Sequence, residues 1–161
     1  MQCTSEVASS MNRTIYIEHN KTKFEIEAEP TPWSVYTRMG KPGVGFVNMQ
    51  VYQDILRTHV RYGWHPRDPI TGPLELEFLF ARSIPKSANK TQPKRNIWCD
   101  DHILMKPDVT NYQKSAEDAL KGIIFNDDSQ VVKVTSKKIY TEGGGYTCIT
   151  ITTPSRMQEE L

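Results

Sequence analysis

The sequence predicts an α+β domain in which a mixed β-sheet carries two main helices packed on one side. Strand-like segments with period-two alternation or β-branched residues occur towards both ends of the chain. Two segments with helical spacing lie between the strands, and clusters of turn residues separate the elements. The predicted order is therefore ββαβαββ. A chain of 161 residues with 37% hydrophobic residues is long enough to form such a domain without disulfides.

The composition is that of a folded, soluble protein with a formal net charge of +1. No apolar run reaches the ~18–20 residues that span a bilayer, so we expect a protein without a membrane segment that works in the cytoplasm. The three cysteines are far apart and lack zinc-ligand spacing, which predicts free thiols. We expect residues 1–10 to be a loose N-terminal extension, with Met11 as a second candidate start, and residues 11–161 to form a single domain.

The first elements are two short strands, Thr14–Ile17 and Thr22–Ala28, separated by a polar turn. In the second strand, Phe24, Ile26 and Ala28 alternate with glutamates. This period of two predicts that one face of the strand is buried and the other is in contact with water.

The first helix is predicted over Asn48–Tyr62, with Asn48 as its N-cap and Gly63 ending it. Residues on one side recur at helical spacing: Val51, Ile55, Leu56 and His59. A proline-rich loop follows, and Leu74–Phe80 alternates as a strand.

The second half of the chain contains a long polar loop, a second helix and two strands. The loop, Ser83–Met105, is longer than the ~15 residues beyond which a loop in a compact domain is often functional or mobile. The second helix is predicted over Thr110–Lys121. Strands are predicted over Gln130–Tyr140 and Tyr146–Thr153, and the Thr-Glu-Gly-Gly-Gly segment between them predicts a hairpin.

The second helix has two contrasting faces. Its predicted core face consists of Tyr112, Ala116, Ala119, Leu120 and Ile123. Its polar stripe consists of Thr110, Lys114, Glu117 and Lys121. A purely structural interpretation is available for this stripe, because Glu117 can pair with both lysines, and Thr110 with Gln113 forms a capping-box pattern. Asp127-Asp128 is likewise typical of a turn before a strand. A catalytic interpretation is also available, because acids before and after the helix can hold Mg²⁺.

An ordered set of residues around this helix forms a recognisable pattern. It comprises Lys106-Pro107-Asp108, Asn111, Lys114, Asp118-Ala119-Leu120, Gly122 and Asp127-Asp128-Ser129-Gln130-Val131-Val132. The pattern resembles the RusA family of Holliday junction resolvases, which are crossover junction endodeoxyribonucleases common in phages and prophages. The weaker similarity extends over roughly residues 24–153.

The resemblance implies a RusA-like fold and a homodimeric endonuclease that nicks opposite strands of four-way DNA junctions. It implies Mg²⁺ as the cofactor, with Mn²⁺ as a second candidate, and a phage- or prophage-encoded protein in a bacterial cell. By position, Asp108 matches the family's first metal-binding aspartate, Asp128 its catalytic aspartate and Asp127 the neighbour of that residue. Lys114 matches the lysine that the family requires for activity.

One position departs from the family pattern, because Thr110 stands where the family has its second acid. The change removes a negative charge and a hard oxygen ligand that Mg²⁺ favours. Glu117, further along the same stripe, is our candidate for the missing carboxylate; the alternative is that it only pairs with the lysines. Four functions therefore remain open: an endonuclease for junctions, a catalytically impaired protein that binds junctions, a nuclease for other branched DNA, and a purely structural subunit.

DNA affinity is expected from basic residues outside the acidic centre, through contacts with phosphates. The candidates are Arg38, Lys41, Lys86, Lys90, Lys94 and Arg95. Trp33, Tyr36 and Trp98 are candidates either for stacking on unpaired bases or for the core. His59 and His102 are expected to be structural or exposed rather than catalytic.

Overall fold

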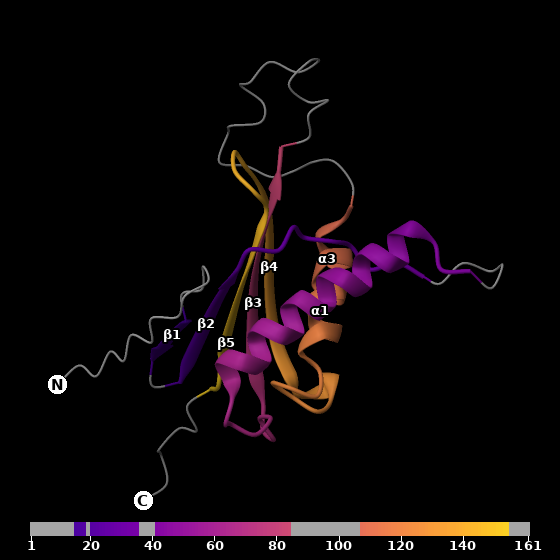
Figure 1. Ribbon diagram of the computed structural model, residues 1–161. Coiled ribbons are helices and arrows are strands. Elements are labelled where there is room, and N and C mark those ends of the chain that lie inside the picture. The colour runs from indigo at the N-terminus through magenta and orange to yellow at the C-terminus, as the bar shows by residue number, and fades with distance from the viewer. Residues whose placement is uncertain (1–14, 19, 36–40, 85–106, 155–161) are drawn as a thin grey trace, which may run out of the picture.

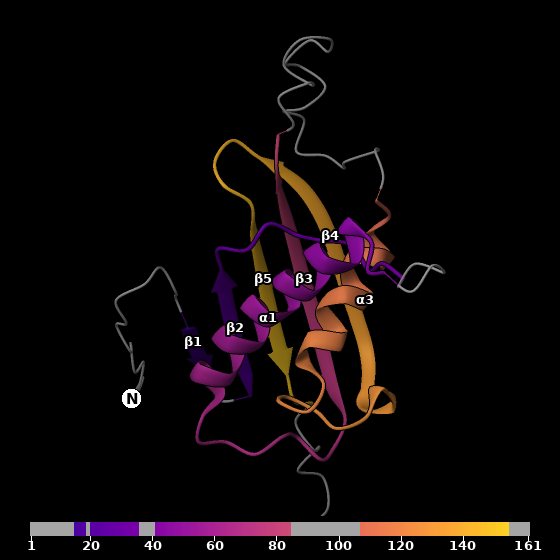
Figure 2. The same ribbon diagram turned by 45° about the vertical axis from the view of Figure 1, so that its right-hand side comes forward.

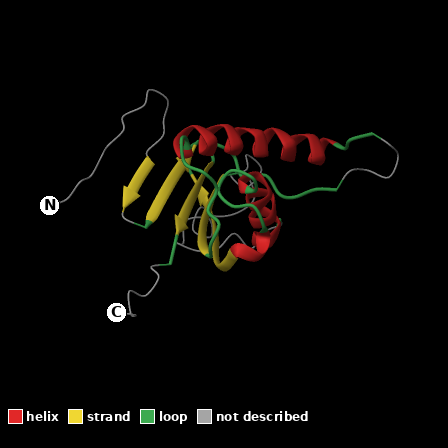
Figure 3. Ribbon diagram, turned by 90° about the horizontal axis from the view of Figure 1, so that it is seen from below, coloured by secondary structure: helices red, strands yellow, loops and turns green. Residues whose placement is uncertain are grey.

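The computed structural model describes residues 15–18, 20–35, 41–84 and 107–154. These residues form a five-stranded sheet whose strands lie in the order β1-β2-β5-β3-β4, and two helices pack against one face of the sheet (Figure 1; Figure 3). In chain order the elements are β1 (Ile15–Glu18), β2 (Lys21–Ile26), α1 (Val44–Trp64), β3 (Leu74–Ser83), α3 (Val109–Leu120), a 3-10 turn η2 (Asp128–Gln130), β4 (Val131–Thr141) and β5 (Tyr146–Thr152). The predicted α+β class with helices on one side is confirmed.

The sheet is mixed because β3 has a parallel neighbour on one side and an antiparallel neighbour on the other. Phe78 of β3 lies opposite Ser136 of the parallel strand β4 and opposite Ile149 of the antiparallel strand β5. The parallel pairing of β3 with β4 requires a crossover connection, which α3 supplies. Helix α1 crosses the sheet obliquely, whereas α3 runs beside β4 (Figure 2).

The predicted hairpin between β4 and β5 is wrong, because β3 lies between these two strands. The glycine-rich segment does reverse the chain, but β5 lies on the far side of β3 from β4 and pairs with β3 and β2 instead. Gly145 in this segment approaches the Glu29 carboxylate so closely that any side chain there would collide with it. The same carboxylate accepts hydrogen bonds from the backbone N and Oγ of Ser83. Gly145 therefore serves close packing at the end of the sheet, and the segment as a whole does not form a two-strand turn.

The core lies between the sheet and the two helices. Leu74, Leu76, Phe78 and Phe80 alternate along β3 with outward-facing residues and are all buried. The predicted inward face of β2 and the predicted core face of α3 are also buried. Because Ala116 and Ala119 are small, α3 can lie close to its neighbours.

Both helices begin earlier than predicted. α1 begins at Val44 after the N-cap Gly43, so Asn48 lies inside the helix. The true core face of α1 contains Tyr52, Leu56 and Val60, whereas Val51 of the predicted stripe is 54% exposed. Residues 44–47 extend the helix without an apolar face against the sheet, which is why a pattern-based boundary misses them.

The start of α3 also corrects the sequence interpretation. Asp108 is the N-cap, so Thr110 lies in the first turn, and the predicted capping box with Gln113 does not form. A capping box does occur in η2, where Asp127 and Gln130 satisfy each other's backbone groups. Asp108 is a better N-cap than Thr110 in the ordinary ranking of residue types.

Buried hydrogen bonds attach α1 to the sheet and to α3. The hydroxyl of Thr147 donates to the Ala28 carbonyl, so its lone pairs are left to accept from the Tyr52 hydroxyl at 2.9 Å. Gln53 Nε2 donates to the Ser115 carbonyl at 3.0 Å. These contacts fix the angle between the helices and so determine which face of α3 is left to solvent.

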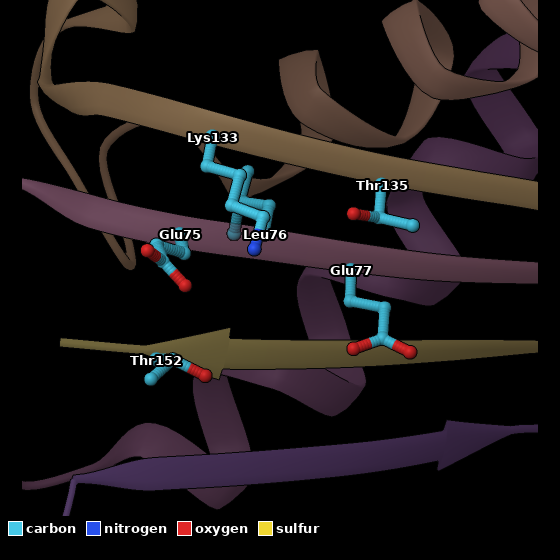
Figure 4. Close-up of a pocket in the computed structure, with 6 residues that line it drawn as sticks. All are labelled: Glu75, Leu76, Glu77, Lys133, Thr135 and Thr152. Atoms are coloured by element: carbon cyan, nitrogen blue, oxygen red, sulfur yellow. The ribbon is translucent and has the colours of Figure 1, made fainter. Parts of the chain in front are cut away.

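Within the residues that the structure describes, no helix packs on the opposite face of the sheet. There, Glu75 and Glu77 of β3, Lys133 and Thr135 of β4, and Thr152 of β5 line a shallow depression (Figure 4). Its acids and lysine alternate across neighbouring strands, as expected for a solvated sheet face. Among the residues that the structure describes, no helix combines the length and apolar character needed to cross a membrane.

Candidate active site

The first end of the candidate site is the start of α3. The backbone around Asp108 is anchored twice: its carbonyl accepts from the Asn111 N–H at 3.0 Å, and the preceding Pro107 carbonyl accepts from Lys138 Nζ at 2.9 Å. Asp108 itself is exposed, and its side chain makes no capping hydrogen bond to the helix. A fixed backbone with a carboxylate directed at solvent is suited to binding a ligand. Thr110, also exposed, follows in the first turn.

Lys114 lies one turn further along the same face. Its Nζ lies 3.6 Å from the centroid of the Trp33 ring, which is cation–π geometry. The Trp33 backbone N–H in turn donates to the Asn111 carbonyl of α3 at 2.9 Å. The lysine is therefore held against an aromatic ring that the helix itself anchors, rather than paired with Glu117 as the structural interpretation expected.

Glu117 lies in the middle of the stripe and is half-buried. Its Oε1 accepts from Gln113 Nε2 at 3.1 Å, and Gln113 Oε1 accepts from the Ser136 hydroxyl of β4 at 2.9 Å. Burial raises the pKa of Glu117; the hydrogen bond from Gln113 opposes this, and the negative charges of Asp128 and Asp118 add to it. Burial and like charges oppose the ionisation of this carboxyl group, so a nearby cation would stabilise its charged form.

The second end of the site follows α3. Lys121 Nζ lies 3.3 Å from Asp128 Oδ2, and both side chains are well exposed. Asp127 Oδ1 accepts from the Ser129 N–H at 2.8 Å, and this hydrogen bonding lowers the pKa of Asp127. Asp127 thus holds the turn together, while the neighbouring Asp128 projects into solvent.

The turn that carries Asp128 is anchored to the loop before β3. Gln130 Nε2 donates to the carbonyls of Ile70 and Gly72 at 2.6 and 3.0 Å. Gly122, with a φ of 84°, ends the helix in the left-handed conformation that glycine adopts most readily. The position of Asp128 beyond the end of α3 is therefore determined by local structure.

One chain does not bring Asp108 and Asp128 to a common point, contrary to the convergence that a shared metal ion requires. Asp108 is the N-cap of α3 and Asp128 lies in η2, beyond the other end of this 12-residue helix, which is about 18 Å long. Mg²⁺–oxygen bonds are only about 2.0–2.1 Å. Within the described residues, no three His, Cys, Asp or Glu side chains lie close enough to hold a metal. The chain presents two exposed half-sites: Asp108 with Lys114, and Asp128 with Glu117 nearby.

Several other predicted residues lie outside the described part of the chain. These are Arg38, Lys86, Lys90, Lys94, Arg95, Tyr36, Trp98 and His102. Lys41 is described and exposed, three residues before α1 begins. His59 Nδ1 donates to the Ile55 carbonyl within α1 at 2.8 Å, which agrees with a structural role.

Sequence reasoning missed the contact between Trp33 and Lys114. It named Trp33 only as a candidate for base stacking or for the core, because 81 positions separate it from Lys114 and no local pattern links them. The only signal was the Pro30-Thr31-Pro32 segment, which favours an extended chain ahead of the tryptophan.

Comparison with known proteins gives two findings. Residues 29–152, which include both half-sites, match the sequence profile of a family described as "Endodeoxyribonuclease RusA". The chain is also similar to the "Uncharacterized protein YqaN" of Bacillus subtilis (strain 168), with 39% identity over 80 residues that cover 48% of this chain and 56% of that protein. The chain thus spans about half the length of this curated relative. Because the profile covers most of the chain and contains all of α3, this protein belongs to the RusA endodeoxyribonuclease family.

Proposed function

We propose that this protein is a Mg²⁺-dependent endonuclease that resolves four-way DNA junctions by paired, symmetric nicks. The observation that supports the proposal best is the family match over residues 29–152 together with the exposure of Asp108, Lys114 and Asp128. Acidic and basic side chains that face solvent from anchored backbone are available to a polyanionic substrate and its cations. We further propose that the protein acts in a bacterial cell and is phage- or prophage-encoded.

The residues of each half-site have distinct proposed roles. Asp108 and Asp128 supply hard oxygen ligands of the kind that Mg²⁺ prefers. Glu117 supplies the carboxylate that is missing where Thr110 replaces the second acid of the family. A bound Mg²⁺ ion lowers the pKa of a water ligand and offsets charge on a phosphodiester. Lys114 contributes a point charge that binds a phosphate oxygen and stabilises the charge that builds up there. Asp127, whose carboxylate caps η2, positions Asp128 and is only a secondary ligand candidate.

The wide spacing of Asp108 and Asp128 supports a site that is completed by a second copy of the chain. If two copies pair about a two-fold axis with their α3 helices antiparallel, the start of one helix meets the end of the other. The polar stripes are complementary in that arrangement, because Lys114 of one copy can face Glu117 of the second copy. A two-fold dimer also presents two sites to two strands, which suits a four-way junction.

The basic residues supply DNA affinity in this proposal. Lys41 and the candidates outside the described residues contact phosphates, so binding recognises the shape of the junction more than its base sequence. Such binding depends on the release of counterions, and we expect the affinity to fall steeply as salt concentration rises. Doubling these residues in a dimer offsets the small net charge of one chain.

The direct test uses an end-labelled four-way junction incubated with the protein and Mg²⁺. We expect symmetric nicks with the wild type, no nicks with Asp108→Asn, and much slower but measurable nicking with Lys114→Met. None of them should nick in excess chelator. Salt-sensitive binding by the variants shows that they are folded. Nicks of equal rate from Asp108→Asn and the wild type would contradict the proposed site, and faster nicking of flaps than of junctions would reassign the substrate.

A second test addresses assembly of the site. Asp108→Asn and Asp128→Asn are inactive alone, whether the site is shared or not. After the two are mixed and allowed to exchange subunits, a shared site returns about a quarter of the wild-type nicking, because about half of the dimers are mixed and each holds one complete site of two. The restored nicks fall on one strand only. A site built within one chain regains nothing on mixing.

The second candidate function is a junction-binding protein without nuclease activity, and Thr110 is the observation that favours it. A family acid is absent there, and the exposed hydroxyl of Thr110 is a weaker ligand for Mg²⁺ than a carboxylate. This candidate predicts tight, salt-sensitive binding of the junction and no nicks under any concentration of Mg²⁺ or Mn²⁺.

A further inference from the structure

A short segment before α1 joins the two helices on the side that carries Lys114. The Trp33 N–H donates to the Asn111 carbonyl of α3 at 2.9 Å, and the Ser34 N–H lies 3.2 Å from the Met49 sulfur of α1. Gly45 of α1 packs so closely that a Cβ there would lie 3.1 Å from Ser34 Oγ. Adjacent residues are thus attached to different helices, and the position of the Trp33 backbone relative to α3 is fixed.

The Trp33 side chain uses this fixed position to hold the ammonium group of Lys114. Lys114 is exposed, and a free lysine side chain explores many rotamers. Its Nζ instead lies 3.6 Å from the centroid of the indole ring. Side chains on a helix lean towards its N-terminus, so this contact keeps the ammonium on the side of Thr110 and Asp108.

The contact leaves the ammonium able to bind a second group. A lysine ammonium has three N–H donors, and an aromatic face attracts the cation without a directional hydrogen bond to each of them. The donors directed away from the ring remain available to phosphate oxygens. A cation that is already in place when charge develops on a phosphate stabilises the transition state more than one that must first be ordered.

We propose that Trp33 is a positioning residue that holds Lys114 ready for the phosphate that the enzyme attacks. The proposal rests on the proposed function, because it is that function which gives Lys114 a phosphate to contact. It also replaces base stacking as the main role of Trp33, since Lys114 covers one face of the indole ring. A base can stack on that face only after it displaces the lysine.

The test combines kinetics on a four-way junction with a double-mutant cycle. We expect Trp33→Leu to lower kcat about ten-fold and to change KM less than about two-fold, because positioning rather than binding is lost. Trp33→Phe, which keeps a weaker aromatic face, should fall between the wild type and Trp33→Leu. In a Lys114→Met background, Trp33→Leu should cause no further loss, because the two side chains act as a unit.

Two controls separate this role from a merely structural one. Thermal unfolding of each variant reports on the folded state, and Tyr62→Leu removes an aromatic ring that is 65% exposed near the other end of α1 and should leave kcat unchanged. By NMR, the ε-methylene protons of Lys114 should show an upfield ring-current shift in the wild type that disappears in Trp33→Leu. This shift tests the contact without any nicking activity.

The outcomes distinguish the two proposals. If Lys114→Met nicks like the wild type, the catalytic role given to Lys114 is wrong. If Lys114→Met nicks much more slowly than the wild type but Trp33→Leu keeps the wild-type kcat, the positioning role of Trp33 alone is overturned. It is also overturned if the loss caused by Trp33→Leu adds fully to that of Lys114→Met. A shift of the Lys114 ε-methylene protons that is the same in the wild type and Trp33→Leu also overturns it.

Discussion

Gln113 donates a hydrogen bond from Nε2 to Oε1 of Glu117 at 3.1 Å, one turn along α3. The same amide accepts from the Ser136 hydroxyl of β4, so its orientation is determined from the sheet side. Glu117 therefore has a defined direction despite lying on a partly exposed helix face. Its burial and its acidic neighbours raise its pKa, which makes its protonation sensitive to both pH and metal.

We predict that Glu117→Gln removes a pH dependence of stability. Because the folded-state pKa of Glu117 is raised, the folded protein binds the Glu117 proton more tightly than the unfolded chain does. The contribution of this proton to the free energy of unfolding is fully present below the unfolded pKa of about 4.3. It is lost as pH rises through the higher folded value. Above that value Glu117→Gln should be more stable than the wild type, by less than about 1 kcal/mol because solvent screens the site.

The measurement is the free energy of unfolding in urea from pH 4 to 8 for the wild type and Glu117→Gln. Glu142→Gln, on the exposed turn before β5, is the matched control and should follow the wild type. If Glu117 also binds Mg²⁺, added Mg²⁺ should raise the melting temperature of the wild type more than that of Glu117→Gln. Parallel pH curves for all three proteins would show that Glu117 is not perturbed.

Thr110→Asp should increase nicking and lower the Mg²⁺ concentration needed for it. The change restores a carboxylate beside Asp108, and one added ligand or supporting group alters metal affinity by roughly 10–100-fold. An acid in the first turn also interacts favourably with the helix dipole, worth about 0.3–1 kcal/mol of stability. A Mg²⁺ titration of the nicking rate and a thermal melt test the two effects, and Thr110→Asn is the uncharged control. A Thr110→Asp protein that needs as much Mg²⁺ as the wild type would exclude Thr110 from the metal site.

Gly122→Ala should destabilise the protein by about 1–2 kcal/mol, because an alanine at a φ of 84° is strained even though no atom crowds the site. Gly143→Ala, where a Cβ also meets nothing within 4 Å and no positive φ occurs, is the matched control and should be nearly neutral. Urea denaturation measures both. Since Gly122 precedes the turn that carries Asp128, Gly122→Ala should also lower the nicking rate, and equal stability of the two variants would contradict this account.

Ser115→Ala should leave stability unchanged or raise it by about 0.5–1 kcal/mol. Within the described part of the chain, the Ser115 hydroxyl is the single buried side-chain polar atom without a hydrogen-bond partner, and alanine is also the better helix former. Tyr52→Phe should instead cost about 1 kcal/mol, because it removes a buried donor to Thr147. Chemical denaturation of both variants checks the contrast. A loss of stability in Ser115→Ala would indicate an unrecognised partner for that hydroxyl.

Local patterns predicted the elements of this fold well. The alternation of Phe24, Ile26 and Ala28 identified the buried face of β2, and the small residues Ala116 and Ala119 identified the inner face of α3. These predictions succeed because periodicity reports directly on which side of an element is buried. The fold class follows from the order of such elements.

Local patterns did not predict the strand order or the contact between Trp33 and Lys114. A glycine-rich turn shows that the chain reverses but not that β3 lies between the strands it joins, since that depends on pairing between distant segments. The separation of Asp108 from Asp128 was calculable, because a helix was predicted between them and each helical residue adds 1.5 Å. The proximity of Trp33 to Lys114, by contrast, arises only when a distant segment packs on α3.

The central place of β5 has a consequence for how the protein is made. β5 joins the β1–β2 pair to the β3–β4 pair, yet it is the last strand along the described chain. During synthesis the two halves of the sheet must therefore wait as separate units until residues 146–152 leave the ribosome. Until then the polypeptide cannot close its sheet, so a nascent or prematurely terminated chain would lack the continuous surface on which both helices pack.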